Sequence, residues 1–81
     1  MNVSVRLFAA ARDSIGTSEL GVELGDGMKI ADLRSKLQND YPELETLFRL
    51  AMFAVNEEYA NDTTTLANED VVACIPPVSG G

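Results

Sequence analysis

One segment of the chain has the repeat of a main helix. Ile30, Leu33 and Leu37 lie at i, i+3 and i+7 within residues 29–39, which places them on one helical face. Arg34 falls largely on another face of the same helix. The chain has 81 residues, enough for one domain with one core. A lone main helix buries its apolar face by packing on a sheet, so an α+β fold is expected.

The remaining apolar segments have the patterns of strands. Apolar and polar side chains alternate in residues 2–7 and again in 20–24, the period of half-buried strands. Residues 52–55 are apolar throughout, and residues 71–75 form the last predicted strand. Residues 59–60 return as a brief strand after a turn. This order predicts a mixed sheet packed on one main helix.

Two short helices and a polar loop complete the expected elements. Residues 9–12 are good helix formers, and Gly16 is a suitable stop just beyond them. Pro42 suits the first turn of another short helix. Residues 61–68 are mostly polar and are expected to form a loop with a possible helical turn. Lys29 is a weak N-cap for the main helix.

The charge balance excludes one large class of partner. Thirteen acidic side chains stand against six basic ones, for a formal net charge of −7. A nucleic-acid-binding surface needs Lys and Arg to neutralise phosphates, so no nucleic-acid partner is expected. The excess of carboxylates either keeps a small domain soluble or speeds its encounter with a basic face on a partner.

The residue inventory also restricts the chemistry. Histidine is absent and Cys74 is the only cysteine, so zinc sites of the Cys/His type, an intrachain disulfide and a Ser-His-Asp arrangement are not expected. Cys74 lies in an apolar strand and is expected to be a buried structural thiol. Neither a signal peptide nor a membrane-spanning run is recognisable, which predicts a cytoplasmic protein. No bound metal or cofactor is expected.

The last six residues have a composition unlike the rest. Pro76 and Pro77 favour an extended backbone that projects the chain away from the domain. Gly80 and Gly81 then give the smallest possible cross-section, which a narrow channel would accept. Such a tail presents an ionised α-carboxylate. A partner could convert this carboxylate with ATP into an acyl-adenylate, and a sulfur donor could then form a thiocarboxylate on Gly81.

Three stretches resemble one known family. They are residues 7–12 with Gly16, residues 54–56 with Tyr59, and residues 75–81. On these residues the chain resembles the ubiquitin-like sulfur carriers of the β-grasp fold, and among them the small subunits of molybdopterin synthase. The resemblance implies a β-grasp domain over residues 1–75 and an extended, flexible Gly-Gly tail over residues 76–81.

The resemblance also implies partners and a reaction. An E1-like adenylyltransferase would use ATP to activate Gly81, and a sulfurtransferase would supply the sulfur. The tail would enter the active site of the large synthase subunit and donate sulfur to cyclic pyranopterin monophosphate, forming the molybdopterin dithiolene. Two carriers and two large subunits would form a heterotetramer, with the catalytic residues on the large subunit. The residues expected to face partners are Phe8, Tyr59, Ile75, Pro76, Pro77, Val78 and Ser79.

Several alternatives stay open at this point. Phe8, Tyr59 and Ile75 could instead be ordinary core residues. The chain could carry sulfur for thiamine, cysteine or tRNA thiolation, could be a modifier conjugated to lysines, or could be an interaction module with an incidental tail. The family commonly has a glycine-containing turn at residues 68–70, where Asn68 is expected to supply the left-handed backbone.

Overall fold

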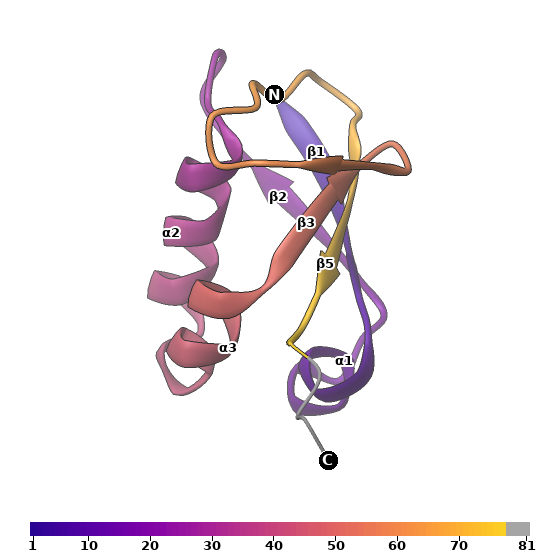
Figure 1. The fold of residues 1–81 in the computed structure, drawn as a ribbon, viewed down its shortest axis with the longest axis vertical. Coiled ribbons are helices and arrows are strands. Elements are labelled where there is room, and N and C mark those ends of the chain that lie inside the picture. Colours follow the sequence, from indigo (N-terminus) through magenta and orange to yellow (C-terminus); the bar gives the residue numbers. More distant parts are fainter. Residues whose placement is uncertain (78–81) are drawn as a thin grey trace.

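The computed structural model describes residues 1–77, which form a five-stranded sheet with one main helix (Figure 1). The strands run in the order β2-β1-β5-β3-β4. Their bounds are β1 (Asn2–Leu7), β2 (Glu19–Glu23), β3 (Met52–Val55), β4 (Glu58–Ala60) and β5 (Val71–Ile75). The helices are α1 (Ala9–Ile15), α2 (Ile30–Asp40), α3 (Glu45–Leu50) and the 3-10 turn η1 (Pro42–Leu44). The expected α+β architecture is confirmed.

The first and last strands meet at the centre of the sheet. β1 pairs with β5 in parallel, and the other three neighbouring pairs are antiparallel. A parallel pair needs a crossover connection, and here the connection runs from β1 to β5 through the whole intervening chain. Figure 1 shows α2 on one side of this sheet and α1 beside the end of β5.

The core lies between α2 and the facing side of the sheet. Alternate residues of β1 point inward, and Val5 is fully buried. The predicted helical face is buried as well, with Ile30 and Leu33 wholly inaccessible. Phe48 and Phe53 are the largest buried side chains. No polar or charged residue of the described chain is buried, so apolar burial is the main source of stability.

The first turn of α2 has hydrogen-bond partners that the sequence did not predict. These partners stabilise the helix although its N-cap residue, Lys29, is weak. The Asp32 carboxylate accepts a hydrogen bond from the Lys29 N–H at 2.8 Å. The loop 61–68 supplies carbonyls to the helix: Ile30 N–H donates to Thr64 O at 3.0 Å, and Ala31 N–H to Asp62 O at 3.1 Å. The free N–H groups of a first helical turn need such partners. This loop, which contains no helical turn, therefore completes α2.

The left-handed residue in the turn before β5 is Glu69, with φ 70°, and the expectation for Asn68 is wrong. The Asn68 side chain is engaged elsewhere, because its Oδ1 accepts the Asn2 N–H at 2.8 Å. The Glu69 N–H donates to Asn2 O at 2.7 Å, which ties the turn to β1. A non-glycine residue pays a steric penalty at this backbone angle.

Replacing Glu69 by glycine should therefore stabilise the fold. The Glu69→Gly variant relieves the left-handed strain, and its net gain is expected to be about 0.5–1 kcal/mol after the added freedom of the unfolded chain is subtracted. Urea unfolding measures the difference. The matched Asn68→Gly variant should lose stability, because it removes the acceptor of the Asn2 N–H and relieves no strain. An unchanged or reduced stability of Glu69→Gly would show that the turn is unstrained.

Candidate functional site

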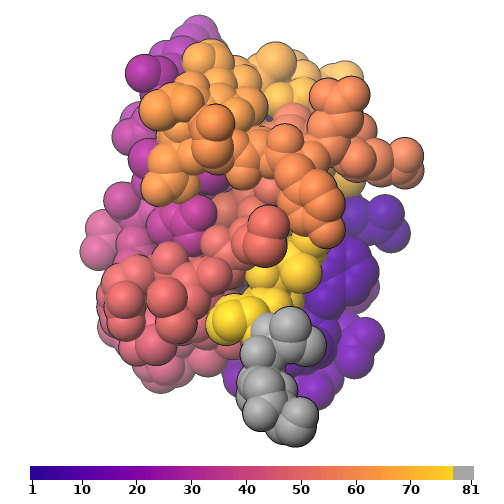
Figure 2. Space-filling model, in the orientation of Figure 1, coloured from indigo at the N-terminus to yellow at the C-terminus, as the bar shows by residue number. Residues whose placement is uncertain are grey.

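The sheet face opposite α2, which we call the outer face, carries several exposed apolar side chains. The pairing register aligns Arg6, Ala73, Ala54 and Tyr59 in one row across four strands. Met52 pairs with Ile75 in a neighbouring row. The large apolar side chains exposed on or beside this face are Phe8, Met52, Tyr59 and Val71. Figure 2 shows β5 (yellow) at the surface between the orange β3–β4 region and the indigo N-terminal segment.

Tyr59 is positioned by a tight hairpin. Asn56 and Glu57 both have positive φ, 49° and 72°, as a two-residue type I′ turn requires. The turn is tied to β5, since Asn56 N–H donates to Val71 O at 2.8 Å and Val71 N–H donates to Asn56 Oδ1 at 3.0 Å. Tyr59 is 74 % exposed, so it does not belong to the core.

Phe8 projects from the junction of β1 and α1. Its backbone is extended, with φ −130°, and Ala9 then turns into the left-handed region at φ 49°. Phe8 is 43 % exposed, so the core alternative does not hold for it either. A shallow hollow of about 470 Å³ adjoins it. Its lining residues come from β1, the β1–α1 junction, β5 and the hairpin turn: Arg6, Phe8, Asn56, Glu57, Val71 and Ala73.

The outer face continues toward the C-terminal end of β5. Ile75, the last residue of the strand, is half-buried and pairs with the exposed Met52. Pro76 is half-buried and Pro77 is exposed. The predicted site residues Val78, Ser79, Gly80 and Gly81 lie outside the described residues.

Cys74 is wholly inaccessible, which confirms the expected buried thiol. Burial raises the pKa of this thiol to about 11, and the Arg34 charge opposes the rise only in part. A neutral, inaccessible thiol is neither a nucleophile nor a sulfur acceptor at neutral pH.

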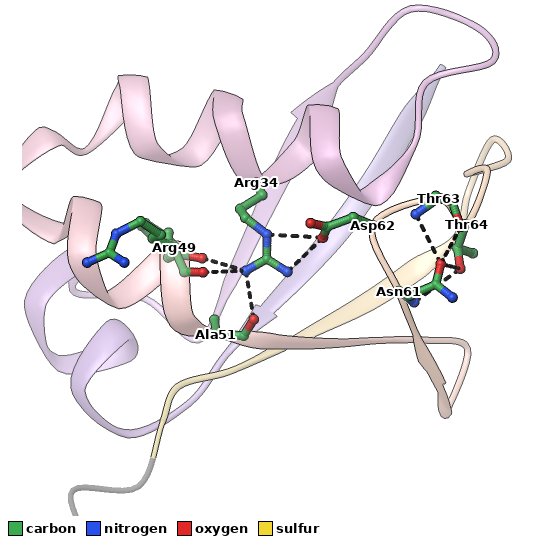
Figure 3. A network of polar contacts seen from close by, with 8 residues as sticks. Arg34, Arg49, Ala51, Asn61, Asp62, Thr63 and Thr64 are labelled. Carbon is green, nitrogen blue, oxygen red and sulfur yellow. Dashed lines mark hydrogen bonds and ion pairs between the residues drawn. The ribbon is translucent and has the colours of Figure 1, made fainter.

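The helical repeat did not indicate any role for Arg34, although its side chain makes several polar contacts. Its guanidinium nitrogen Nη1 donates to Ala51 O at 2.7 Å, to Phe48 O at 2.8 Å and to Arg49 O at 3.2 Å (Figure 3). Nη2 donates to Asp62 Oδ1 at 2.9 Å. The guanidinium carbon also lies 4.8 Å from the centre of the Phe53 ring.

These contacts give Arg34 a structural role beneath the outer face. The carbonyls at the end of α3 lack partners within the helix, and Arg34 supplies their donor. It thereby fixes the path from α3 into β3, the strand that pairs with both β4 and β5. Arg34 lies one turn after Ile30 and one turn before Leu37, so it borders the apolar face of α2. This position was the sequence signal that could have identified Arg34.

The described residues contain neither a metal-ligand cluster nor a membrane-spanning helix. Within residues 1–77 no group of three or more His, Cys, Asp or Glu side chains is arranged to hold a metal ion. None of the helices in this part of the chain has the length and apolar character needed to cross a membrane.

The fold and the outer face define a class. A mixed sheet in the order 2-1-5-3-4 that encloses one main helix is the ubiquitin-like β-grasp arrangement. The crystal structure of SAMP1, the small archaeal modifier protein 1 of Haloferax volcanii, superposes with a TM-score of 0.84 at 26 % identity, covering all of both chains. The chain belongs to the ThiS family, whose model matches residues 5–81.

Two further comparisons match proteins whose names refer to molybdopterin. The "Molybdopterin synthase sulfur carrier subunit" of Chlamydomonas reinhardtii is 39 % identical over 83 aligned positions, covering all of both chains. A chain of the "Protein-protein complex of subunit 1 and 2 of Molybdopterin-converting factor" from Helicobacter pylori is 28 % identical, with a TM-score of 0.70 and full coverage of both chains.

Proposed function

We propose that this chain is the sulfur carrier subunit of a molybdopterin synthase. The observation that carries the proposal is its full-length similarity to the Chlamydomonas reinhardtii protein of that name. The outer face supports it, because an exposed apolar surface on a small domain is typical of an interface. The face reaches Ile75 and Pro76, directly before the tail that contains Gly80 and Gly81.

The chemistry takes place on the terminal carboxylate. An E1-like adenylyltransferase joins the Gly81 carboxylate to the AMP moiety of ATP and releases pyrophosphate. A sulfurtransferase supplies the sulfur at the oxidation level of sulfide, and this hydrosulfide adds to the acyl carbon and expels AMP. The thiocarboxylate sulfur bonds to a carbon of cyclic pyranopterin monophosphate, and water then cleaves its bond to the Gly81 acyl carbon, which restores the carboxylate. Repeated donation completes the molybdopterin dithiolene. ATP serves the activating enzyme, and the carrier itself binds no cofactor.

The partners follow from this sequence of steps. The large synthase subunit binds the outer face and receives the tail, from Pro76 to Gly81, in its active site. The complex described for the Helicobacter pylori subunits supports such a pairing. Two carriers and two large subunits form a heterotetramer in the cytoplasm, and the large subunits provide the catalytic residues. Neither nucleic acid nor membrane takes part.

Intact-mass spectrometry tests the proposal. The chain is incubated with ATP, a sulfide source and a ThiS-family activating enzyme, and a mass increase equal to the replacement of one oxygen by sulfur is expected on Gly81. Adding a large synthase subunit and the cyclic pyranopterin should then return the mass to its starting value. A loaded carrier that keeps its sulfur in their presence, and releases it only to a different acceptor system, would assign the chain to another sulfur pathway.

A second function is favoured by one observation, the similarity to the small archaeal modifier protein. If the chain is a modifier, its activated Gly81 forms isopeptide bonds with lysines of other proteins. Adducts that survive strong reductant and denaturant in cells would support this function. Their absence, together with thiocarboxylate formation, would support the carrier.

The Tyr59→Ala variant tests the outer face as the interface. Removing an exposed aromatic anchor should weaken binding to the large subunit about 10- to 30-fold, since aromatic side chains dominate interface energies. The melting temperature should stay unchanged, because Tyr59 contributes little to the core. Calorimetric titration measures the affinity, and Glu58→Ala on the same strand is the control. Unchanged affinity for Tyr59→Ala would place the interface elsewhere.

A further inference from the structure

The outer edge of β2 has backbone groups free to pair. β2 has only β1 as a neighbour in the described sheet. Leu24 and Met1 are hydrogen-bonded to each other, as are Leu7 and Ser18. Bonded pairs alternate along an antiparallel ladder, so Glu19, Gly21 and Glu23 direct their N–H and C=O groups away from β1. The Thr17 hydroxyl engages both groups of Glu19, which leaves those of Gly21 and Glu23.

A groove runs beside this edge, between β2 and α2. Two adjoining hollows of about 390 and 280 Å³ share Glu23, Lys36 and Asp40 in their lining. Leu20 and Tyr41, both half-buried, supply apolar wall in the smaller hollow. Met28 does so in the larger one. An added strand would therefore find backbone partners at the edge and apolar contacts on the helix side.

The charges around the groove are unequal. On α2 the lining contains the carboxylates of Asp32 and Asp40 against the single ammonium group of Lys36. Lys36 already pairs with Asp40 at 3.5 Å. On the strand itself, Glu19 and Glu23 are exposed on the side away from α2. A basic occupant is the electrostatic complement of this surface.

The same charges disfavour a second copy of the chain. Antiparallel pairing of two β2 strands about Gly21 would place Glu19 of each copy opposite Glu23 of the other. Like charges directly opposite each other destabilise a strand pair. Gly21 itself leaves the position open, since a Cβ added there would meet no atom within 4 Å.

We propose that the β2 edge and its groove bind an extended segment of a partner protein as an additional strand. The segment has basic residues four positions apart, opposite Glu19 and Glu23, because alternate side chains of a strand face the same side. Apolar residues at the two positions between them that face α2 contact Leu20 and Tyr41. Main-chain bonds to Gly21 and Glu23 provide the register. The site lies at the β2 edge of the sheet, whereas Tyr59 of the outer face lies on β4, at the opposite edge.

Nuclear magnetic resonance titration of the whole chain tests this site with a blocked peptide, Ser-Lys-Val-Thr-Val-Lys-Ser. Shifts are expected in residues 19–24 and along the facing side of α2, with slower amide exchange at Gly21 and Glu23. The double variant Glu19→Lys, Glu23→Lys should bind this peptide at least about tenfold more weakly. It should also gain affinity for the matched peptide that has Glu in place of Lys. The control Glu43→Lys, Glu57→Lys adds the same charge elsewhere.

Three outcomes would overturn the proposal. The first is no binding by the wild-type chain at low salt, in which case the glutamates only protect the edge against aggregation. The second is binding that maps to Tyr59 and Val71 on the outer face and leaves the β2 edge unshifted. The third is dimerisation through β2 without peptide, seen by sedimentation, which would make a second copy the occupant.

Discussion

A chain that lacks Gly81 is expected to fold normally and to transfer no sulfur. All residues of the described core lie between Val3 and Cys74, so the deletion removes no part of it. It moves the terminal carboxylate back by one residue, up to about 3.5 Å along an extended chain. A misplacement of about 1 Å can already cost about 100-fold in rate. The loss in sulfur transfer should therefore be at least about 1,000-fold.

Two measurements separate this result from a folding defect. The melting temperature of the truncated chain should equal that of the wild type, and its affinity for the large subunit should fall far less than its activity. The Gly81→Ala variant is the matched control, because it keeps the carboxylate at its original distance and adds only a methyl group. It should retain more activity than the deletion. A folded, truncated chain that transfers sulfur at the wild-type rate would contradict the carrier proposal.

Replacing Arg34 should cause the largest loss of stability among single changes outside the apolar core. The Arg34→Met variant keeps the aliphatic stem and removes the donor to three carbonyls, those of Phe48, Arg49 and Ala51. Arg34 is 18 % exposed, so water replaces these bonds only in part. Hydrogen bonds to charged groups contribute about 1.5–3 kcal/mol, and the expected total loss is about 3 kcal/mol. That corresponds to roughly 12–24 °C in melting temperature for a domain of this size.

The ion pair with Asp62 is the smaller part of this effect. Asp62 is 55 % exposed, and exposed pairs contribute at most about 1 kcal/mol. Asp62→Asn is therefore the control, since its backbone carbonyl still accepts the Ala31 N–H. Urea unfolding of both variants measures the difference. If Arg34→Met costs no more than Asp62→Asn, the three carbonyl contacts do not stabilise the fold.

The elements could be predicted from local patterns, and their arrangement only in part. The helical repeat at Ile30, Leu33 and Leu37 and the alternation in residues 2–7 are local signals, and both are confirmed. The parallel pairing of β1 with β5 joins residues nearly 70 positions apart, such as Leu7 and Cys74. Such a pairing leaves no trace in the periodicity of either strand.

The residues of the candidate site, too, could be predicted only in part. The resemblance singled out Phe8 and Tyr59, and the structure places both outside the core, although their role in binding remains a prediction. Arg34 was missed because its partners are backbone carbonyls, and a carbonyl has no residue-specific signature in sequence. The left-handed position was assigned to Asn68 from residue preference, whereas the bond from its side chain to Asn2 shifts that geometry to Glu69.

The central place of β5 has a consequence for synthesis. Of the five described strands this one is the last to leave the ribosome, yet it holds β1 on one side and β3 on the other. A chain interrupted before residue 71 lacks the element that joins the two halves of the sheet, so it cannot complete the outer face. Contacts between distant residues also form late in folding. The proposed partner surface thus exists only on chains whose synthesis has reached residue 75, directly before the proposed reactive tail, and unfinished chains would not compete for the proposed partners.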